Sequence, residues 1–475
     1  MEKTLVNLFS AIVLLGCLNW GVTSCSSDND STTGSNTANP YKIAVISDIH
    51  VFDDDKIEHS GEAWDKYLAF DNKLLLYSKA IMEKTIEKIK EENVRYVIIS
   101  GDLTKDGEIV NHELTAQYLK KIEDAGIDVF VINGNHDISN ANSRSYHSDG
   151  TTTPIETATA ADFLRIYADF GYDKAVSRET NGLSYSVNMG SNIRLIFMDS
   201  NIYNDSKDNP HQETAGTLRA SILQWACQQA KTAVAEGKVP IGVMHHGLME
   251  HVPVLQTYLL GDMIVDNYQE AQQQLSEAGM NIIFTGHSHE QDISSVMLGD
   301  KTFYDIETGS LSGMCPMRFI TIDPSLRTFD IHSWHMDNVA GVDLNGKKSF
   351  REMVNDYMYK GYLKNVDYMI GKVLKQMGTS EDQIALIKKQ LEPLPLENGT
   401  TVQVALANSF YAHKYGDEKI DAGVQANVDA LDRYVAQFMQ AGNAEYAKLL
   451  QMVKKVYLAF YTDTPSADND IKISY

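Results

Sequence analysis

The chain of 475 residues is 43% hydrophobic and 22% charged, a composition that excludes a disordered chain, a collagen-like fibre and a multi-span membrane protein. Its 41 Lys and Arg residues against 64 Asp and Glu residues give a net charge of −23. This charge argues against a nucleic-acid polymer as a partner, because nothing would offset the repulsion from its phosphates. At about 150 residues per domain, the length allows two or three domains.

Residues 1–24 are predicted to form a lipoprotein signal peptide. A charged start precedes an apolar run over 5–18, which is shorter than the roughly 20 residues of a membrane span. Residues 22–25, Val-Thr-Ser-Cys, resemble a bacterial lipobox. The resemblance implies that Cys25 is lipidated and anchors the exported protein to the outer membrane, at the cell surface or on the periplasmic face. Cys17 is a second candidate for lipidation, and an uncleaved anchor helix is an alternative.

Residues 25–40 are predicted to be a flexible linker, because they are rich in Ser, Thr, Asn, Asp and Gly and end at Pro40. From Tyr41 onward, short apolar runs alternate with helical stretches, which is typical of an α/β fold. The runs are continuous enough for strands buried on both faces. They cover residues 42–47, 95–100, 128–133, 193–198, 240–244 and 281–285, with helices expected at 74–89, 113–125 and 218–235.

The pattern changes after Ile306. Residues 318–322 and 328–334 alternate in the manner of antiparallel strands, and apolar residues follow helical spacing from about residue 350. We therefore predict a mixed α/β domain over 41–338 and a helical C-terminal domain over 339–475. The Met and Tyr stripes of the helical part are interpreted as core packing. The two cysteines of the body, Cys227 and Cys315, are expected to be unlinked thiols.

Most of the predicted strands end on polar residues that can bind metals. In an open α/β sheet, ligands bind beyond the carboxyl ends of the strands, so these residues are expected to converge there. Asp-x-His and His-x-His motifs place two side chains on the same side of an extended segment. The candidates, in chain order, are Asp48, His50, Asp102, Asn135, His136, His245 with His246, His287 and His289.

Carboxylate, amide and imidazole ligands form a mixed oxygen and nitrogen set, which suits Mn²⁺, Fe or Zn²⁺. At least seven candidate ligands are too many for one ion, and they suit two divalent metal ions about 3.5–4 Å apart that share one carboxylate. Three glycines, Gly101, Gly134 and Gly286, stand beside these residues and are expected to let the backbone turn sharply.

This ordered set of motifs resembles the calcineurin-like metallophosphoesterase family over roughly residues 41–334. The resemblance implies a four-layer α/β/β/α sandwich core with a C-terminal helical subdomain. It implies that one metal is held by Asp48, His50, Asp102 and His289. The second would be held by Asp102, Asn135, His287 and a histidine of the pair at 245–246. In the family the ligand stands two residues before a proline. Gly247 stands in the place of that proline here. The residue two positions before it is His245, which is therefore favoured over His246.

The same resemblance implies that the protein is an enzyme that hydrolyses a small phosphoester, with a hydroxide shared by the metals as the attacking group. His136 would face the substrate and stabilise or protonate the leaving oxygen. Asp137 would orient the loop or the imidazole, or simply cap the loop. Lys105 stands where purple acid phosphatases have a metal-bound tyrosine, so a protein of that type is not expected.

The motifs are nearer the branch of cyclic-nucleotide and glycerophosphodiester phosphodiesterases, so phosphodiesters are the preferred substrate class. A phosphomonoesterase or nucleotidase with the same site is an alternative, and so is a non-catalytic binding lipoprotein built on this fold. Residues 51–72 and 138–160 are long enough to shape the substrate site, and Arg144 in the second is a candidate phosphate ligand.

Overall fold

The structure is a computed structural model that describes residues 40–70, 72–211, 213–253, 255–258, 261–376 and 378–474. The predicted signal peptide, Cys25 and nearly all of the predicted linker lie outside these residues and stay predictions. Residues 38–475 form one compact unit. Within the part of the chain that is described, no helix combines the length and the apolar character needed to cross a membrane.

Two sheets form the centre of this unit. The first has the strand order β15-β14-β13-β1-β2-β3 and the second the order β11-β12-β10-β9-β8-β7-β6. The first sheet contains β1 (Tyr41–Ile46), β2 (Tyr96–Ile99), β3 (Asp128–Val131), β13 (Pro316–Asp323), β14 (Thr328–His335) and β15 (Asp470–Ser474). The second contains β6 (Ser177–Arg178), β7 (Tyr185–Met189), β8 (Ile193–Met198), β9 (Val239–Met244), β10 (Ile282–Thr285), β11 (Ile293–Leu298) and β12 (Lys301–Glu307). A separate ribbon pairs β4 (Arg144–Tyr146) with β5 (Thr152–Pro154).

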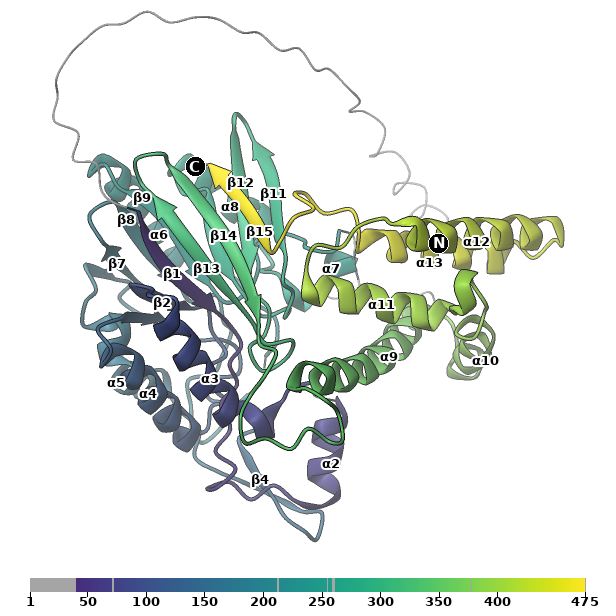
Figure 1. The fold of residues 1–475 in the computed structure, drawn as a ribbon, viewed down its shortest axis with the longest axis horizontal. Helices are drawn as coiled ribbons and strands as arrows, with labels where there is room; N and C mark the ends of the chain where they lie inside the picture. Colours follow the sequence, from purple (N-terminus) through teal and green to yellow (C-terminus); the bar gives the residue numbers. More distant parts are fainter. Residues whose placement is uncertain are drawn as a thin grey trace, which may run out of the picture. The chain divides into compact units, whose positions relative to one another are not determined.

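The sheets face each other and helices cover both outer faces, which confirms the expected four-layer sandwich. The Tyr185 hydroxyl of the second sheet donates to the Val131 carbonyl oxygen of the first, at 2.7 Å. The rings of Phe130 and Phe197 lie 6.3 Å apart between the sheets. Helices α3 and α4 lie on the first sheet, and α6 and α8 on the second (Figure 1). The helices of this part are α2 (Gly61–Phe70), α3 (Ser78–Glu91), α4 (Ile109–Glu123), α5 (Ala160–Ile166), α6 (Ala220–Ala235), α7 (Leu255–Tyr258) and α8 (Tyr268–Glu277).

The six apolar runs all form strands, because their side chains are buried on both faces of a sheet. Every residue of β2, β8 and β10 is buried. β1, β2 and β3 are parallel neighbours, with Val45 opposite Ile98 and Ile98 opposite Phe130. β8, β9 and β10 are likewise parallel. The carboxyl ends of each trio therefore meet at one edge, where the polar motifs follow.

The C-terminal region is helical, as expected, until its last strand. Its helices are α9 (Phe350–Gln376), α10 (Glu381–Leu391), α11 (Val402–Tyr415), α12 (Ala422–Gln440) and α13 (Ala444–Ala459). Their Met and Tyr side chains, such as Met358 and Tyr362, join the same hydrophobic cluster as the strands. β15, yellow in Figure 1, then pairs with β14 in the first sheet. The sequence analysis missed this strand, in which Ile471 and Ile473 alternate with polar residues.

The two cysteines within the described residues are buried free thiols, as expected. Cys227 lies in α6, and Cys315 directly precedes β13. Burial raises the pKa of the Cys315 thiol to about 12, so this side chain stays protonated and behaves as an apolar residue.

Candidate metal centre

The predicted ligands converge at the carboxyl ends of five strands. Asp48 and His50 follow β1, Asp102 follows β2, and Asn135 follows β3. From the second sheet, His245 follows β9, and His287 and His289 follow β10. Residues separated by up to 241 positions in the sequence therefore come together where the edges of the two sheets meet.

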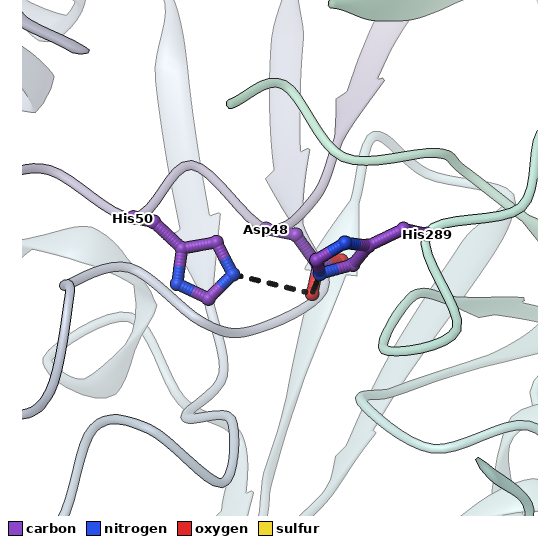
Figure 2. A group of neighbouring side chains, drawn as sticks. All are labelled: Asp48, His50 and His289. Atoms are coloured by element: carbon purple, nitrogen blue, oxygen red, sulfur yellow. Dashed lines mark ion pairs between the residues drawn. The ribbon is translucent and has the colours of Figure 1, made fainter. Parts of the chain in front are cut away.

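The first group consists of Asp48, His50 and His289, whose ligand atoms lie within 4.8 Å of one another. The Oδ1 atom of Asp48 is 3.2 Å from Nε2 of His289 and 3.9 Å from Nε2 of His50. In Figure 2 the His50 imidazole lies to one side of the Asp48 carboxylate, and the His289 imidazole overlaps the carboxylate in this view. Asp48 and His50 are fully buried, while His289 is half-buried.

The second group consists of Asp102, His245 and His287, with Asn135 beside them. Nε2 of His245 is 3.3 Å from Oδ2 of Asp102 and 3.0 Å from Oδ1 of Asn135. Nδ1 of His287 lies 3.2 Å from the same nitrogen of His245. Oδ2 of Asp102 also approaches Nε2 of His50, at 3.6 Å, so Asp102 lies between the two groups.

The histidines are oriented by backbone carbonyl groups on their far sides. Nδ1 of His50 donates to the Thr104 carbonyl oxygen at 3.2 Å, and Nδ1 of His245 to that of Ser100 at 2.9 Å. Nε2 of His287 donates to the Asp262 carbonyl oxygen at 3.0 Å. Because each of these nitrogens carries a proton, the other nitrogen of each ring is the one directed toward the centre, and it presents a lone pair whenever the ring is neutral.

The donor set fits divalent cations. Among the described residues, no hydrogen-bond partner reaches Oδ1 of Asp48 or Nε2 of His50, although both atoms are buried. Buried polar atoms normally have a partner, so both atoms have the character of metal ligands. Burial by itself would raise the pKa of Asp102, but the surrounding histidines hold it well below its usual value. The carboxylate is therefore ionised and available to bind cations.

His246 differs from His245 in its surroundings. Nδ1 of His246 accepts from the Ser200 hydroxyl at 2.8 Å, and Nε2 donates to the Thr214 carbonyl oxygen at 2.9 Å. Both ring nitrogens are therefore engaged away from Asp102. Burial and the neighbouring His245 lower the pKa of His246 to about 3, so the ring is neutral. This geometry favours His245 as the ligand of the pair.

Five of these residues have left-handed backbone conformations, which are uncommon for side chains other than glycine and cost roughly 1–2 kcal/mol each. The φ angles are +51° at Asp48, +41° at His50, +51° at Asp102, +76° at His287 and +62° at His289. Such strain persists only where the surrounding structure enforces it, and it gathers at functional sites. The strained backbone conformations therefore occur at residues that the sequence motifs predict to be metal ligands.

Comparison with known proteins identifies the family. The model of the family described as calcineurin-like phosphoesterase matches residues 41–291, which is more than half of the chain. The chain belongs to this family. It is therefore a hydrolase of phosphoric esters, and its family depends on two metal ions. No curated protein sequence matches the chain.

The chain is similar to several solved structures at low sequence identity. A dimetal phosphatase from Danio rerio is 12% identical, with a TM-score of 0.43 over 62% of this chain and 96% of its own. The purple acid phosphatase PPD1 from yellow lupin seeds is 12% identical, with a TM-score of 0.39 over 63% and 52%. A structure of PhoD is 13% identical, with a TM-score of 0.34 over 62% and 66%.

His136 lies at the rim of the phosphoesterase centre. Its Nδ1 faces the Lys105 carbonyl oxygen at 2.8 Å and Oδ1 of Asp106 at 2.9 Å. Its Nε2 is 3.2 Å from Nζ of Lys73 and 4.0 Å from Oδ2 of Asp102. Burial and Lys73 would lower the pKa of His136, but Asp102 and Asp106 outweigh them and raise it. The imidazole is thus held at Nδ1, and its Nε2 is within hydrogen-bond distance of the Lys73 ammonium.

Asp106 is the residue that the sequence analysis missed. It is fully buried and is the partner of both Lys105 and His136. The Lys105 ammonium also pairs with Glu108, at 3.3 Å, and lies 4.3 Å from the centre of the Tyr67 ring. A buried lysine requires paired carboxylates, so the Lys-Asp-x-Glu pattern is the signal that could have drawn attention to Asp106.

Asp137 holds the loop rather than the imidazole. Its carboxylate accepts hydrogen bonds from the backbone N–H groups of Leu103, Thr104 and Gly134, at 2.8–3.1 Å. These bonds tie the segment after β2 to the segment after β3. Of the two roles considered from the sequence, the geometry supports the positioning of the loop, while Asp106 and the Lys105 carbonyl orient His136.

The glycines act in two different ways. Gly101 has a φ of +102°, so it fits the expected sharp turn. Gly134 has no such φ, and its importance lies in close approach: a Cβ atom there would lie 2.1 Å from Oδ1 and 2.3 Å from the backbone nitrogen of Asp102. Gly286 is similarly close to Ser47 Oγ, at 2.0 Å. The chain turns at both positions, where the Asp137 N–H donates to the Gly134 carbonyl oxygen and the Ser288 N–H to that of Gly286. Glycine is needed there because a side chain would collide with Asp102 or Asp48.

Replacing Gly134 with alanine should therefore displace Asp102 and weaken metal binding. We expect a lower metal content per chain and a loss of hydrolysis of about 10²-fold, because a shift of roughly 1 Å in a catalytic group has that effect. The matched control is Gly371→Ala in α9, where the nearest atom is Nζ of Lys388 at 4.0 Å. Metal content and activity equal to those of the control would contradict this role.

Proposed function

We propose that this phosphoesterase hydrolyses phosphodiesters with two divalent metal ions of Mn, Fe or Zn. The observation that carries the proposal is the pair of adjoining ligand groups that share Asp102, with His136 at their rim. In the proposed assignment, Asp48, His50, Asp102 and His289 hold one ion, and Asp102, Asn135, His245 and His287 hold the other. When bound, such ions supply an activated water and positive charge for the phosphate oxygens.

His136 is proposed to assist departure of the leaving oxygen. Its Nδ1 is fixed by Asp106 and the Lys105 carbonyl, so its Nε2 can hold a proton toward the substrate. The carboxylate of Asp106 has a pKa lowered to about 2, because Lys105 and His136 outweigh the effect of burial. An ionised Asp106 stabilises a protonated imidazole, which is the form that a proton donor requires.

A cavity of about 630 Å³ beside His136 is the proposed place for the leaving group. Its wall includes the aromatic rings of Tyr67 and Tyr146. Lys73 also lines the cavity, beside His136. Such a wall suits an organic ester group rather than bare phosphate. Lys73 is proposed to bind a phosphate oxygen, because a charged ammonium donates strong hydrogen bonds to phosphate.

The second candidate for phosphate binding, Arg144, has other contacts. Its Nε donates to Oγ1 of Thr152 at 2.7 Å, and Nη2 to the Thr152 carbonyl oxygen at 3.4 Å. The guanidinium therefore stiffens the β4–β5 ribbon along the cavity. A phosphodiester carries one negative charge fewer than a fully ionised monoester and needs fewer cations. This arrangement supports a diester as the preferred substrate, with monoester or nucleotide hydrolysis as the alternative.

We further propose that the protein works outside the cytoplasm, anchored to the outer membrane through lipidated Cys25, where it meets small phosphoesters. The support for this is the lipobox-like sequence at 22–25 and the acidic, polar segment that follows it. A nucleic-acid polymer remains an unexpected partner, because the net charge of −23 would repel it.

The substrate class can be tested by assaying bis-p-nitrophenyl phosphate and p-nitrophenyl phosphate side by side with Mn²⁺. We expect turnover of both and a higher kcat/KM for the diester. A higher kcat/KM for the monoester would overturn the diester preference in favour of a phosphomonoesterase. Two bound metals per chain without release of p-nitrophenol from either ester would instead identify a binding protein on a phosphoesterase fold.

A further inference from the structure

A second buried group of acidic residues lies where the helical C-terminal region meets the second sheet. We call it the junction cluster. Its residues come from segments distant in the sequence: Asp292 before β11, His413 in α11, Glu418 after α11, and Asp463 and Asp468 between α13 and β15. The four elements can be located in Figure 1. None of these residues belongs to the metal centre described above.

The junction cluster has the spacing of a cation site. Asp292, His413 and Glu418 each offer a ligand atom, and these atoms lie within 4.8 Å of one another. The same holds for Asp292 with Asp463 and Asp468. Asp292 belongs to both triads, so its carboxylate lies at the centre of the cluster.

Several oxygens of the cluster face this centre without a hydrogen bond. Within the described chain, Oδ1 of Asp292, Oε2 of Glu418 and both carboxylate oxygens of Asp463 have no hydrogen-bond partner. These residues are only 0%, 5% and 9% exposed. Burying a carboxylate oxygen without a partner is strongly unfavourable unless a cation or a proton neutralises the carboxylate.

The remaining contacts leave an excess of negative charge. His413 donates through Nδ1 to Oε1 of Glu418, and His251 donates to Oδ2 of Asp292. Arg318 donates to backbone carbonyl oxygens, including those of Asp292 and Asp468, rather than to their carboxylates. Further carboxylates close to the cluster are those of Glu290, Asp305 and Glu307. The cations near these carboxylates are Lys414, Arg318 and the imidazoles of His251 and His413, whose pKa the neighbouring carboxylates raise against the effect of burial.

We propose that the junction cluster binds one further divalent cation of the Ca²⁺ class. The unpartnered ligand atoms are carboxylate oxygens, which suit hard cations such as Ca²⁺, whereas the metal centre is rich in imidazole nitrogen and suits Mn²⁺, Fe or Zn²⁺. Asp292, Asp463 and Asp468 supply carboxylate ligands on one side, and Glu418, from the triad that shares Asp292, supplies one on the other. His413 is not a ligand in this proposal; its hydrogen bond orients the Glu418 carboxylate.

Such an ion would connect the helical region to the loop of the metal centre. Asp292 follows His289 by three residues, and Asp468 Oδ1 accepts from the backbone N–H of Ile293 at 3.0 Å. Asp468 Oδ2 accepts from the N–H of Asp417, at 2.8 Å, just beyond α11. The cation is thus placed to stabilise β15, α11 and the segment carrying His287 and His289 together.

The alternative neutralising agent is the proton. With no cation bound, burial together with Asp292 and Glu418 raises the pKa of Asp463 to about 7 and that of Asp468 to about 9. Protonation of these carboxyl groups would therefore neutralise the cluster without a cation. The two possibilities differ in their response to calcium and to removal of one carboxylate.

The test measures calcium bound per chain by mass spectrometry of the metals and the Tm with calcium or EGTA. We expect one equivalent of Ca²⁺ in the wild-type protein and a Tm about 3 °C higher with calcium. The variants Asp463→Asn and Glu418→Gln should lose both the equivalent and the Tm shift. The charge-matched control is Asp470→Asn, which removes an exposed carboxylate of β15 and should retain both.

The result that overturns the proposal is a wild-type protein that binds no calcium, or calcium binding that survives in both variants. A higher Tm of Asp463→Asn without any calcium dependence would show that protons neutralise the cluster. Because the readouts are calcium content and Tm, they do not depend on hydrolysis. Calcium held at the metal centre would persist in Asp463→Asn, so the proposed function and this inference fail separately.

Discussion

Replacing Asp102 with alanine should release both catalytic metal ions and abolish phosphoester hydrolysis. Its Oδ2 atom approaches His245 at 3.3 Å and His50 at 3.6 Å, one from each ligand group. Removing the shared carboxylate therefore leaves both groups with fewer ligands and less negative charge. We expect metal content to fall from two ions per chain toward none, and kcat/KM for a phosphoester to fall by about 10³-fold or more.

The control for this variant is Asp199→Asn, another buried aspartate at the end of a strand. Its carboxylate accepts hydrogen bonds from Asn133, Asn201 and Tyr203 and lies outside both ligand groups. This variant should keep two metals, provided that circular dichroism shows a folded protein. An Asp102→Ala protein that retains two metals and full activity would contradict the proposed centre.

Replacing His136 with glutamine should leave both metals bound and slow the departure of the leaving group. The imidazole contributes no ligand atom in the proposed assignment, while its Nε2 lies at the rim of the centre, 3.2 Å from Nζ of Lys73. Loss of a positioned proton donor reduces rates by about 10²–10⁴-fold. We expect this loss for alkyl esters, whose leaving oxygen needs a proton, and a much smaller loss for p-nitrophenyl esters. The measurement is kcat for both ester types, together with metal content.

Asp106→Asn is the matched variant for the role of His136. It keeps the size of the side chain but removes the charge that raises the pKa of the imidazole. We expect a smaller loss, about 10–100-fold, with the same dependence on the leaving group. Equal losses for alkyl and p-nitrophenyl esters in His136→Gln would contradict proton donation and indicate a role in binding alone.

The sequence by itself was sufficient for the framework of the phosphoesterase core. Continuous apolar runs are a local property, so the six buried strands could be predicted to within a few residues. The polar residue that follows each run is also local information. Because parallel strands bring their carboxyl ends to one edge, the convergence of Asp48, Asp102 and the histidines could be anticipated before any coordinates.

Only the tertiary structure showed how these side chains are supported. Asp106 orients His136 across 30 positions of sequence, and Ser200 and Thr214 engage His246 from distant loops. The need for Gly134 arises from the close approach of Asp102 rather than from its own φ angle. None of these contacts leaves a periodic trace in the sequence.

The junction cluster and β15 depended even more on the tertiary structure. Asp292 and Asp468 are separated by 176 positions, and each is an unremarkable acidic residue in its own segment. β15 is a short strand whose partner, β14, lies on the far side of five helices in the chain. Local patterns report which residues are buried. Which buried charges meet depends on the folding of the whole chain, because long-range packing brings their segments together.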